Sequence, residues 1–213
     1  MKIAGIVLAG GASRRMGADK AELRLGNSRV LDIIAGELFS ITSELYIATG
    51  TVNRGEGQAP KYVEVKDIYT GSGPLAGLHA GLLRGEADLY VVASCDIPLI
   101  RADLLSAMVQ EMEVESKPRV QALVPQINGQ IHPLAAVYHH SIINVLETQL
   151  REDKRRVMDM LSKISVRYVT EFELEAITGI PAARIEEMFT NMNEKEDYER
   201  VKQIYRSRHK GGN

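Results

Sequence analysis

The chain contains little of what marks secreted, zinc-binding or membrane proteins. It has a single cysteine, Cys95, among 213 residues. Neither an internal disulfide nor a cysteine-based zinc site can form from one cysteine, which suits a reducing compartment. The apolar runs fall short of the roughly 18 residues that a membrane-spanning helix needs. These absences predict a cytoplasmic protein without a membrane partner.

A strong charge of one sign is also missing. Lys and Arg number 26, against 28 for Asp and Glu. Such a balance provides no broad basic surface for nucleic acid or for an anionic membrane. Nucleic acid is therefore not expected as a partner, and any anion must be bound by local groups.

The first residues could be mistaken for a secretory signal, because Lys2 precedes an apolar stretch that ends in small residues. The stretch is short and runs directly into Arg14 and Arg15. It is therefore interpreted as a first buried strand.

The chain does have a regular alternation of strand-like and helix-like segments. Ile3–Leu8 is a continuous apolar run followed by glycines, which is typical of a strand buried on both faces. Similar runs predict strands at residues 45–48, 62–65, 89–95, 120–124 and 134–138. Apolar residues at helical spacing predict helices at residues 30–39, 74–83, 102–112 and 141–150. The alternation predicts an α/β domain of three layers, α/β/α, with a mostly parallel sheet that collects ligands beyond the carboxyl ends of its strands.

The second half of the chain changes this pattern. Asn128 and Gly129 lie between two runs of β-forming residues and predict a hairpin, so a mixed sheet is expected. A helix that ends at Leu161 and a short strand at residues 166–169 should follow. The pattern is weaker from 171 to 187, where Pro181 is expected to open a helix. We expect one domain over residues 1–205 and a disordered polar tail at 206–213.

A glycine-rich basic loop follows the first strand. Gly10 and Gly11 allow backbone amides to converge on phosphate oxygens. Arg14, Arg15 and Lys20 bring three cations to the same loop, which matches a triphosphate. The spacing is neither that of the P-loop nor G-x-G-x-x-G. Taken alone, the pattern also allows a glycine turn with solvated basic residues.

Two acidic residues follow later strands. Asp67 precedes a glycine-rich segment in which Gly77 and Gly81 share one helix face; tight packing of that helix is the alternative explanation for the glycines. Asp96 leaves a buried strand at the edge where ligands collect, and magnesium favours one or two carboxylates completed by phosphates and water. Asp96 is the predicted metal ligand, with a helix cap as the alternative.

Positions 8–20, LAGGASRRMGADK, resemble the signature L-A-G-G-x-S-x-R-M-G-x-D-K of the nucleotidyltransferase family that includes molybdenum cofactor guanylyltransferase. The resemblance implies a Rossmann-like nucleotidyltransferase domain that uses Mg²⁺ to join the GMP part of GTP to molybdopterin and releases pyrophosphate. The paired glycine favours guanine, since cytidylyl-transferring relatives usually have L-A-A-G. The family's D-x-x-x-x-x-G-P-L-A-G and C-D-x-P segments are matched around Asp67 and Asp96.

The resemblance also implies roles for individual residues. The catalytic set is Arg15, Lys20 and Asp96, and the nucleotide-binding set is Leu8, Ala9, Gly10, Gly11, Lys20, Asp67 and Asp96. Asp67 would contact the base or the ribose.

The acceptor-binding candidates lie near the carboxyl end of the chain. Asn191 and Asn193 match the family's F-x-N-I-N-T-P-E-D, whereas Glu194 and Lys195 replace its Thr and Pro, which puts the start of the next helix in doubt. His132 lies in a segment that resembles the family's acceptor side, but a structural role at a strand end is an equal alternative.

Two other functions remain possible at this point: a cytidylyl- or sugar-phosphate nucleotidyltransferase, and a non-catalytic regulator that binds nucleotides. Hydrolase and zinc-enzyme motifs such as G-x-S-x-G and H-E-x-x-H do not occur in the sequence. The family also implies transient contact with molybdoenzymes or with other cofactor-biosynthesis proteins.

Overall fold

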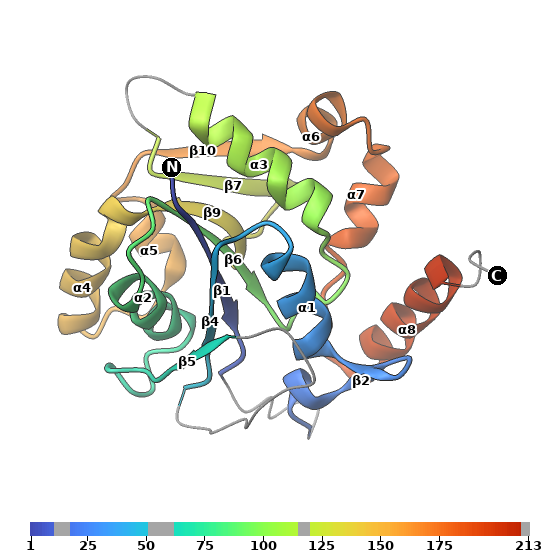
Figure 1. The fold of residues 1–213 in the computed structure, drawn as a ribbon, viewed down its shortest axis with the longest axis horizontal. Helices are drawn as coiled ribbons and strands as arrows, with labels where there is room; N and C mark the ends of the chain where they lie inside the picture. The colour runs from blue at the N-terminus through green and yellow to red at the C-terminus, as the bar shows by residue number, and fades with distance from the viewer. Residues whose placement is uncertain (11–17, 51–61, 115–119, 210–213) are drawn as a thin grey trace.

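The computed structural model describes residues 1–10, 18–50, 62–114 and 120–209. Within these ranges one eight-stranded sheet lies between two layers of helices (Figure 1). Its strands are β1 (Ile3–Leu8), β4 (Glu44–Ala48), β5 (Val63–Val65), β6 (Leu89–Ser94), β7 (Ala122–Ile127), β8 (Gln130–Ile131), β9 (Ala135–His139) and β10 (Val166–Thr170). The helices are α1 (Val30–Phe39), α2 (Pro74–Arg84), α3 (Ala102–Val114), α4 (Ile143–Arg151), α5 (Val157–Leu161), α6 (Glu171–Thr178), α7 (Ala182–Met188) and α8 (Lys195–His209).

The sheet is mixed and mostly parallel, as the sequence predicts. Its order is β10-β7-β9-β6-β1-β4-β5, with β8 paired to β7. Strand β1 is parallel to both β4 and β6, and β9 is antiparallel to β6 and β7. The predicted hairpin joins β7 to β8, and its turn residues Asn128 and Gly129 have φ values of 50° and 74°. Two successive positive φ angles are what a two-residue hairpin turn of type I′ requires.

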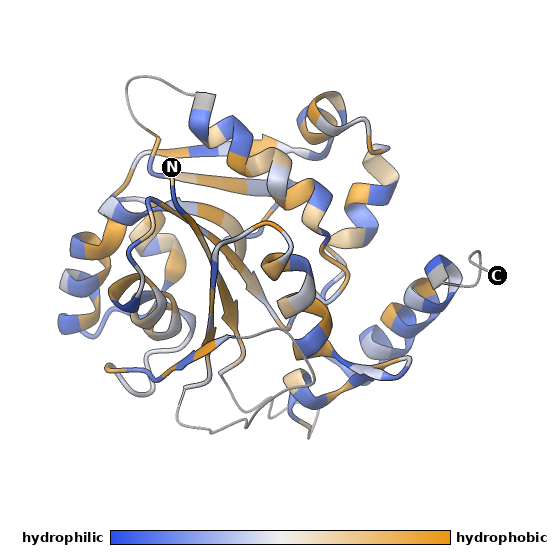
Figure 2. Ribbon diagram, in the orientation of Figure 1, coloured by the Kyte–Doolittle hydropathy of each residue, from blue (hydrophilic) through white to orange (hydrophobic). Residues whose placement is uncertain are grey.

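Both faces of the sheet are buried. Side chains such as Val7 pack against α1 and α3, whereas Ile6 and Leu8 pack on the opposite face against α2 and α4. Alternating residues of one strand therefore enter two separate cores, which explains why β1 is apolar throughout. In Figure 2 the central strands are largely hydrophobic, and the helices carry hydrophilic residues on their outer sides.

Several elements differ from the sequence-based expectations. The short strands β2 (Arg24–Leu25) and β3 (Ser28–Arg29) and the helix α6 were not predicted. Residues 206–209, expected in the polar tail, continue α8, because Arg208 of this helix donates hydrogen bonds to the carbonyl of Leu99 at 3.1 Å and to Glu187 at 3.3 Å. Residues 210–213 of the expected tail lie outside the described part of the chain. Among the described helices, none combines the length and the apolar character needed to cross a membrane.

Candidate active site

The carboxyl ends of β1, β4 and β6 meet at one edge of the sheet. Leu8, the last residue of β1, is in register with Ala48 of β4 and Ser94 of β6. A cavity of about 230 Å³ opens at this edge. It is lined by Leu8, Gly10, Ala48, Gly73, Pro74, Gly77, Ser94, Asp96 and Leu134. This is the position at which open α/β sheets bind their ligands.

Three polar side chains from distant parts of the chain meet beside this cavity. Lys20 Nζ donates hydrogen bonds to Asp96 Oδ1 at 2.7 Å and to Asn193 Oδ1 at 2.8 Å. The Lys20 side chain is 13% exposed, and that of Asp96 is 41% exposed. A lysine ammonium has three N–H donors. Two are used by Asp96 and Asn193, so a third can be donated to a bound anion.

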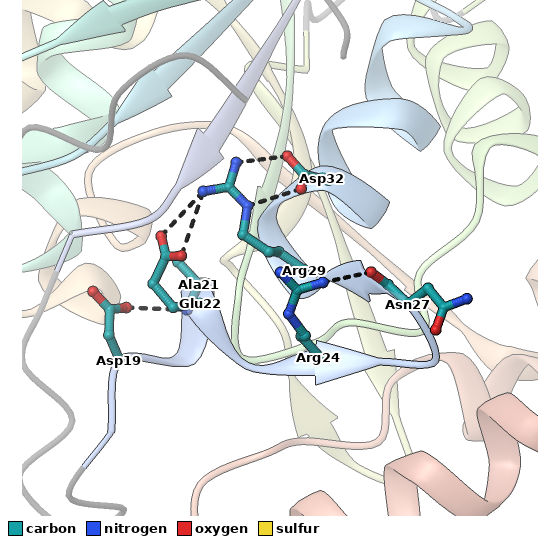
Figure 3. A network of polar contacts seen from close by, with 7 residues as sticks. All are labelled: Asp19, Ala21, Glu22, Arg24, Asn27, Arg29 and Asp32. Carbon is teal, nitrogen blue, oxygen red and sulfur yellow. Dashed lines mark hydrogen bonds and ion pairs between the residues drawn. The ribbon is translucent and has the colours of Figure 1, made fainter. Parts of the chain in front are cut away.

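Lys20 is held in place by the segment that leaves the glycine-rich loop. It opens the short 3-10 helix η1 (Lys20–Glu22), which is capped by a hydrogen bond from the backbone N–H of Ala21 to Asp19 at 3.0 Å. Arg29 links this helix to α1: it lies 3.4 Å from Glu22 and bonds Asp32 with two contacts of 2.8 Å (Figure 3). The hydrogen bonds to Asp32 raise the pKa of Arg29 above its usual value. A bidentate arginine–carboxylate pair of this kind has a fixed geometry, and from it the Arg29 guanidinium contacts Glu22 of η1.

Asp96 and Asn193 are joined through the backbone. The carbonyl of Asp96 accepts a hydrogen bond from the N–H of Met192 at 2.8 Å, and the Met192 side chain is fully buried. Asp197 Oδ2 in turn accepts the N–H groups of Asn193 and Glu194, each at 2.9 Å. Helix α8 therefore begins with a side-chain cap despite the missing Thr-Pro pair. Asp96 does not cap the following helix, α3. The N–H of Ala102 at the start of α3 instead donates a hydrogen bond to Glu37 Oε2 at 2.7 Å.

Asp67 lies close to Gly77, one of the residues that line the cavity. Its Oδ1 atom is buried and has no hydrogen-bond partner among the described residues. Burial raises the pKa of this carboxyl above its usual value. A Cβ at Gly77 would lie 3.0 Å from Ala48 Cβ, 3.0 Å from Leu8 Cδ2 and 3.8 Å from Asp67 Oδ1. The glycine therefore permits close packing of α2 on the sheet and also keeps the space near Asp67 open.

The loop itself is described only in part. The N–H of Ala9 donates to the carbonyl of Ala48 at 2.9 Å, and a Cβ at Gly10 would lie 3.0 Å from the backbone nitrogen of Gly50. Gly10 therefore allows two loop backbones to pass in close contact. Gly11, Arg14 and Arg15 lie outside the described residues.

Of the residues singled out from the sequence, Leu8, Gly10, Lys20, Asp96 and Asn193 are gathered at one edge. Asn191 is half-buried, two residues before Asn193 in the same segment. His132 is buried; its ring centroid lies 4.9 Å from that of Phe189, and burial lowers its pKa.

Sequence reasoning missed three residues that line the cavity, Ala48, Ser94 and Leu134. Ser94 lies one residue before the end of the strand predicted at 89–95, and that position near the ligand-binding edge was the available signal. Ala48 and Leu134 have ordinary core side chains that give no such signal.

Comparison with known proteins adds an independent observation. A family model described as "MobA-like NTP transferase domain" matches residues 5–167. The chain is 34% identical over 202 residues to a Peptoclostridium acidaminophilum protein named "Probable molybdenum cofactor guanylyltransferase", with 93% of this chain and 88% of that protein covered. It is also 34% identical over 200 residues to a protein of the same name from Bacillus subtilis (strain 168), with 93% and 94% covered. The crystal structure of molybdopterin-guanine dinucleotide biosynthesis protein A from Archaeoglobus fulgidus has a TM-score of 0.77 and 26% identity, covering 97% of this chain and 100% of that one.

Proposed function

Because the chain belongs to the family of MobA-like NTP transferases and is therefore a nucleotidyltransferase, we propose that it is a magnesium-dependent guanylyltransferase. The GMP part of GTP would be transferred to the terminal phosphate of molybdopterin, which forms the guanine dinucleotide cofactor and releases pyrophosphate. The names of its relatives support this choice of nucleotide and acceptor.

The observation that carries the proposal is the contact of Lys20 with both Asp96 and Asn193 at the rim of the cavity. It brings together a cation for the phosphates, a carboxylate for a metal ion and an amide for the acceptor. A regulator that only binds nucleotides would use the cation, and the carboxylate for a magnesium-bound nucleotide, but has no use for an amide that faces an acceptor. Transfer chemistry therefore explains the cluster better than binding alone.

Asp96 would hold the Mg²⁺ ion. Its side chain is 41% exposed, and among the described residues Lys20 bonds only its Oδ1 atom, so Oδ2 is left for a metal ion. Among the described residues, no group of three or more His, Cys, Asp or Glu side chains could enclose a metal ion. In this proposal the ion is bound by the one carboxylate of Asp96 and completed by substrate phosphates and water. When bound, Mg²⁺ supplies charge neutralisation at the phosphates.

The chain's own residues would act by positioning and by charge. An acceptor phosphate oxygen attacks the α-phosphorus in line; the new P–O bond forms as the bond to the bridging oxygen breaks, and its electrons leave with pyrophosphate. A phosphate monoester is largely dianionic near pH 7, since its second pKa is about 6, so no protein base is needed. Lys20 and Arg15 would neutralise the triphosphate, and the amides of Gly10 and Gly11 would position it. Asn191 and Asn193 would orient the acceptor.

Asp67 would read the base. A carboxylate only accepts hydrogen bonds when ionised. The pairing edge of guanine offers two adjacent donors, N1–H and the N2 amino group, whereas that of cytosine offers only its N4 amino group. The buried Asp67 Oδ1, which has no partner within the described residues, therefore favours guanine over cytosine.

Calorimetry with GTP, CTP, ATP and UTP, with and without Mg²⁺, tests the nucleotide assignment. We expect magnesium-dependent binding selective for GTP, and we expect Lys20→Met to weaken it about 10- to 100-fold, because hydrogen bonds to charged groups contribute about 1.5–3 kcal/mol. Lys154→Met is the matched control, since Lys154 is exposed and pairs with Glu152 away from the cavity. Preference for CTP would move the protein to the cytidylyl transferases. Absence of binding to all four nucleotides would refute the proposal.

A further inference from the structure

Ser94 is a buried polar residue to which neither the sequence motifs nor the proposed mechanism gives a role. It is the last residue of β6 and is 4% exposed. Its Oγ atom is buried and makes no hydrogen bond to any described residue. The residue nevertheless lines the cavity at the carboxyl edge of the sheet. Buried hydroxyl groups in native proteins usually have a partner, so this one needs an explanation.

The neighbours of Ser94 make the missing hydrogen bond costly. Alternation along β6 places Ser94 on the same face as Val92, where Leu8 and Ala48 also pack. Leu134 contributes to the same cavity wall. An alanine would fill this position without leaving a polar atom unsatisfied. A serine here is understandable if a ligand in the cavity supplies the partner.

The order of the strands indicates which part of a nucleotide would reach Ser94. Asp96 follows β6, and Asp67 follows β5, three strands away in the order β6-β1-β4-β5. At about 4.8 Å per strand, the two strand ends are roughly 14 Å apart, and the Asp67 side chain lies near Gly77, which lines the same cavity as Ser94 and Asp96. With phosphates beside Asp96 and Lys20 and the base beside Asp67, the ribose would lie between the two carboxylates, in the cavity that Ser94 lines together with Leu8 and Gly77.

The chemistry of the position agrees with a ribose. A neutral hydroxyl among aliphatic side chains is a poor site for a phosphate, which instead meets the cation of Lys20 at the rim. A serine hydroxyl both donates and accepts hydrogen bonds, as a ribose hydroxyl does. We infer that Ser94 is a nucleotide-contacting residue whose hydroxyl exchanges a hydrogen bond with a ribose hydroxyl of the bound nucleotide, an inference that rests on the proposed function.

The test compares wild type with Ser94→Ala, using calorimetry with GTP, 2′-deoxy-GTP and 3′-deoxy-GTP in the presence of Mg²⁺. Ser94→Ala should weaken GTP binding about 3- to 10-fold, the range expected for one neutral hydrogen bond. One of the two deoxynucleotides should bind wild type and variant equally, because the partner of Ser94 is already missing from it. Ser43→Ala is the matched control: Ser43 bonds the carbonyl of Ile3 at 3.0 Å, at the opposite edge of the sheet, and should leave all three affinities unchanged.

A thermal unfolding scan of the nucleotide-free proteins separates this role from a structural one. Ser94→Ala should melt at the wild-type temperature or above it, since the change removes a buried hydroxyl that lacks a partner. A clearly lower melting temperature would assign Ser94 a structural role and overturn the inference. Equal GTP affinity in wild type and Ser94→Ala, or the same loss with all three nucleotides, would also overturn it. If wild type binds GTP in those cases, the proposed function still stands; if wild type binds none of the three, the proposed function itself fails.

Discussion

Individual residues at the carboxyl edge of the sheet differ in how completely their polar atoms are bonded. Lys20 and Asp96 form a short ion pair, whereas Asp67 Oδ1 and Ser94 Oγ are buried and have no partner among the described residues. A buried polar atom without a partner lowers the stability of the unliganded protein. Groups of this kind at a ligand-binding edge are therefore candidates for contacts that form only when the ligand binds.

Asp67→Asn tests this at a carboxyl whose Oδ1 atom is buried and has no partner among the described residues. Burial raises the pKa of Asp67, so the folded chain holds a proton at this carboxyl more readily than the unfolded chain does. The ionised carboxylate therefore destabilises the fold above the raised pKa, and this cost disappears as the pH falls through it. Asp67→Asn should raise the melting temperature at pH 7.5, with a smaller gain at pH 5, measured by scanning calorimetry.

The same variant should lose GTP affinity by about 10- to 100-fold, because hydrogen bonds to a charged group contribute about 1.5–3 kcal/mol. Asp153→Asn is the matched control: Asp153 is 73% exposed and has a φ of 55°, which asparagine tolerates. A fall in melting temperature at pH 7.5, or unchanged GTP affinity, would show that Asp67 has a structural role instead.

Some residues of the site can be identified from the sequence alone, and others cannot. Asp96 and Lys20 could be identified because a charged residue after a buried strand or in a glycine-rich loop has few structural explanations. Ser94 could not, because a serine at the end of an apolar strand attracts no attention until its burial and its missing partner are known. The roles of Gly11 and Arg15 stay predictions, since both lie outside the described residues.

Among the elements, the start of α8 connects stability with the site. Asp197 caps this helix by accepting the N–H groups of Asn193 and Glu194, and Asn193 contacts Lys20. The cap therefore fixes the backbone from which the Asn193 amide reaches the cluster. It also compensates for the Thr and Pro that this chain lacks at positions 194 and 195.

Asp197→Ala should lower the free energy of unfolding by about 1 kcal/mol, because it removes the first-turn carboxylate that accepts two backbone N–H groups at the start of α8. It should also lower kcat for GMP transfer about tenfold, because Asn193 is no longer held and small displacements of positioning groups are costly. Urea unfolding and steady-state kinetics measure the two effects. Glu199→Ala is the control in the same helix. It removes only the pairing of Glu199 with Lys202, and the Glu199 side chain is 61% exposed, so the free energy of unfolding and kcat should both stay near wild type. Loss of stability in Asp197→Ala with unchanged kcat would refute the positioning role.

Elements were predictable where one simple pattern dominated. The range of β1, the range of α1 and the turn at Asn128 and Gly129 agree with the sequence, because double-sided burial, helical spacing and turn chemistry each leave a clear pattern. Helix α6 was missed although Thr170 and Glu173 form a capping box at its start. The apolar residues of this helix do not mark one buried face, since Phe172 is 66% exposed.

In the molecule as a whole, the fold brings residues that are far apart in the sequence together at one edge of the sheet. Lys20 is 76 residues from Asp96 and 173 residues from Asn193 along the sequence, yet it bonds both. Spacing in the sequence cannot reveal such contacts. The α/β class predicted only that strand ends would share an edge, and Asn193 reaches the site from the segment before α8, near the carboxyl end of the chain.

Formation of the dinucleotide from GTP and molybdopterin, followed by chromatography together with pyrophosphate release, measures guanylyl transfer directly. We predict that wild type with Mg²⁺ forms dinucleotide and pyrophosphate in equal amounts, uses GTP in preference to CTP and releases no pyrophosphate without the acceptor. Asp96→Asn should stay folded and lose at least about 100-fold in kcat, as expected when a group that stabilises transferring charge is removed. Preferential use of CTP, pyrophosphate release without molybdopterin, or full activity in Asp96→Asn would contradict the proposed reaction or the assigned metal ligand.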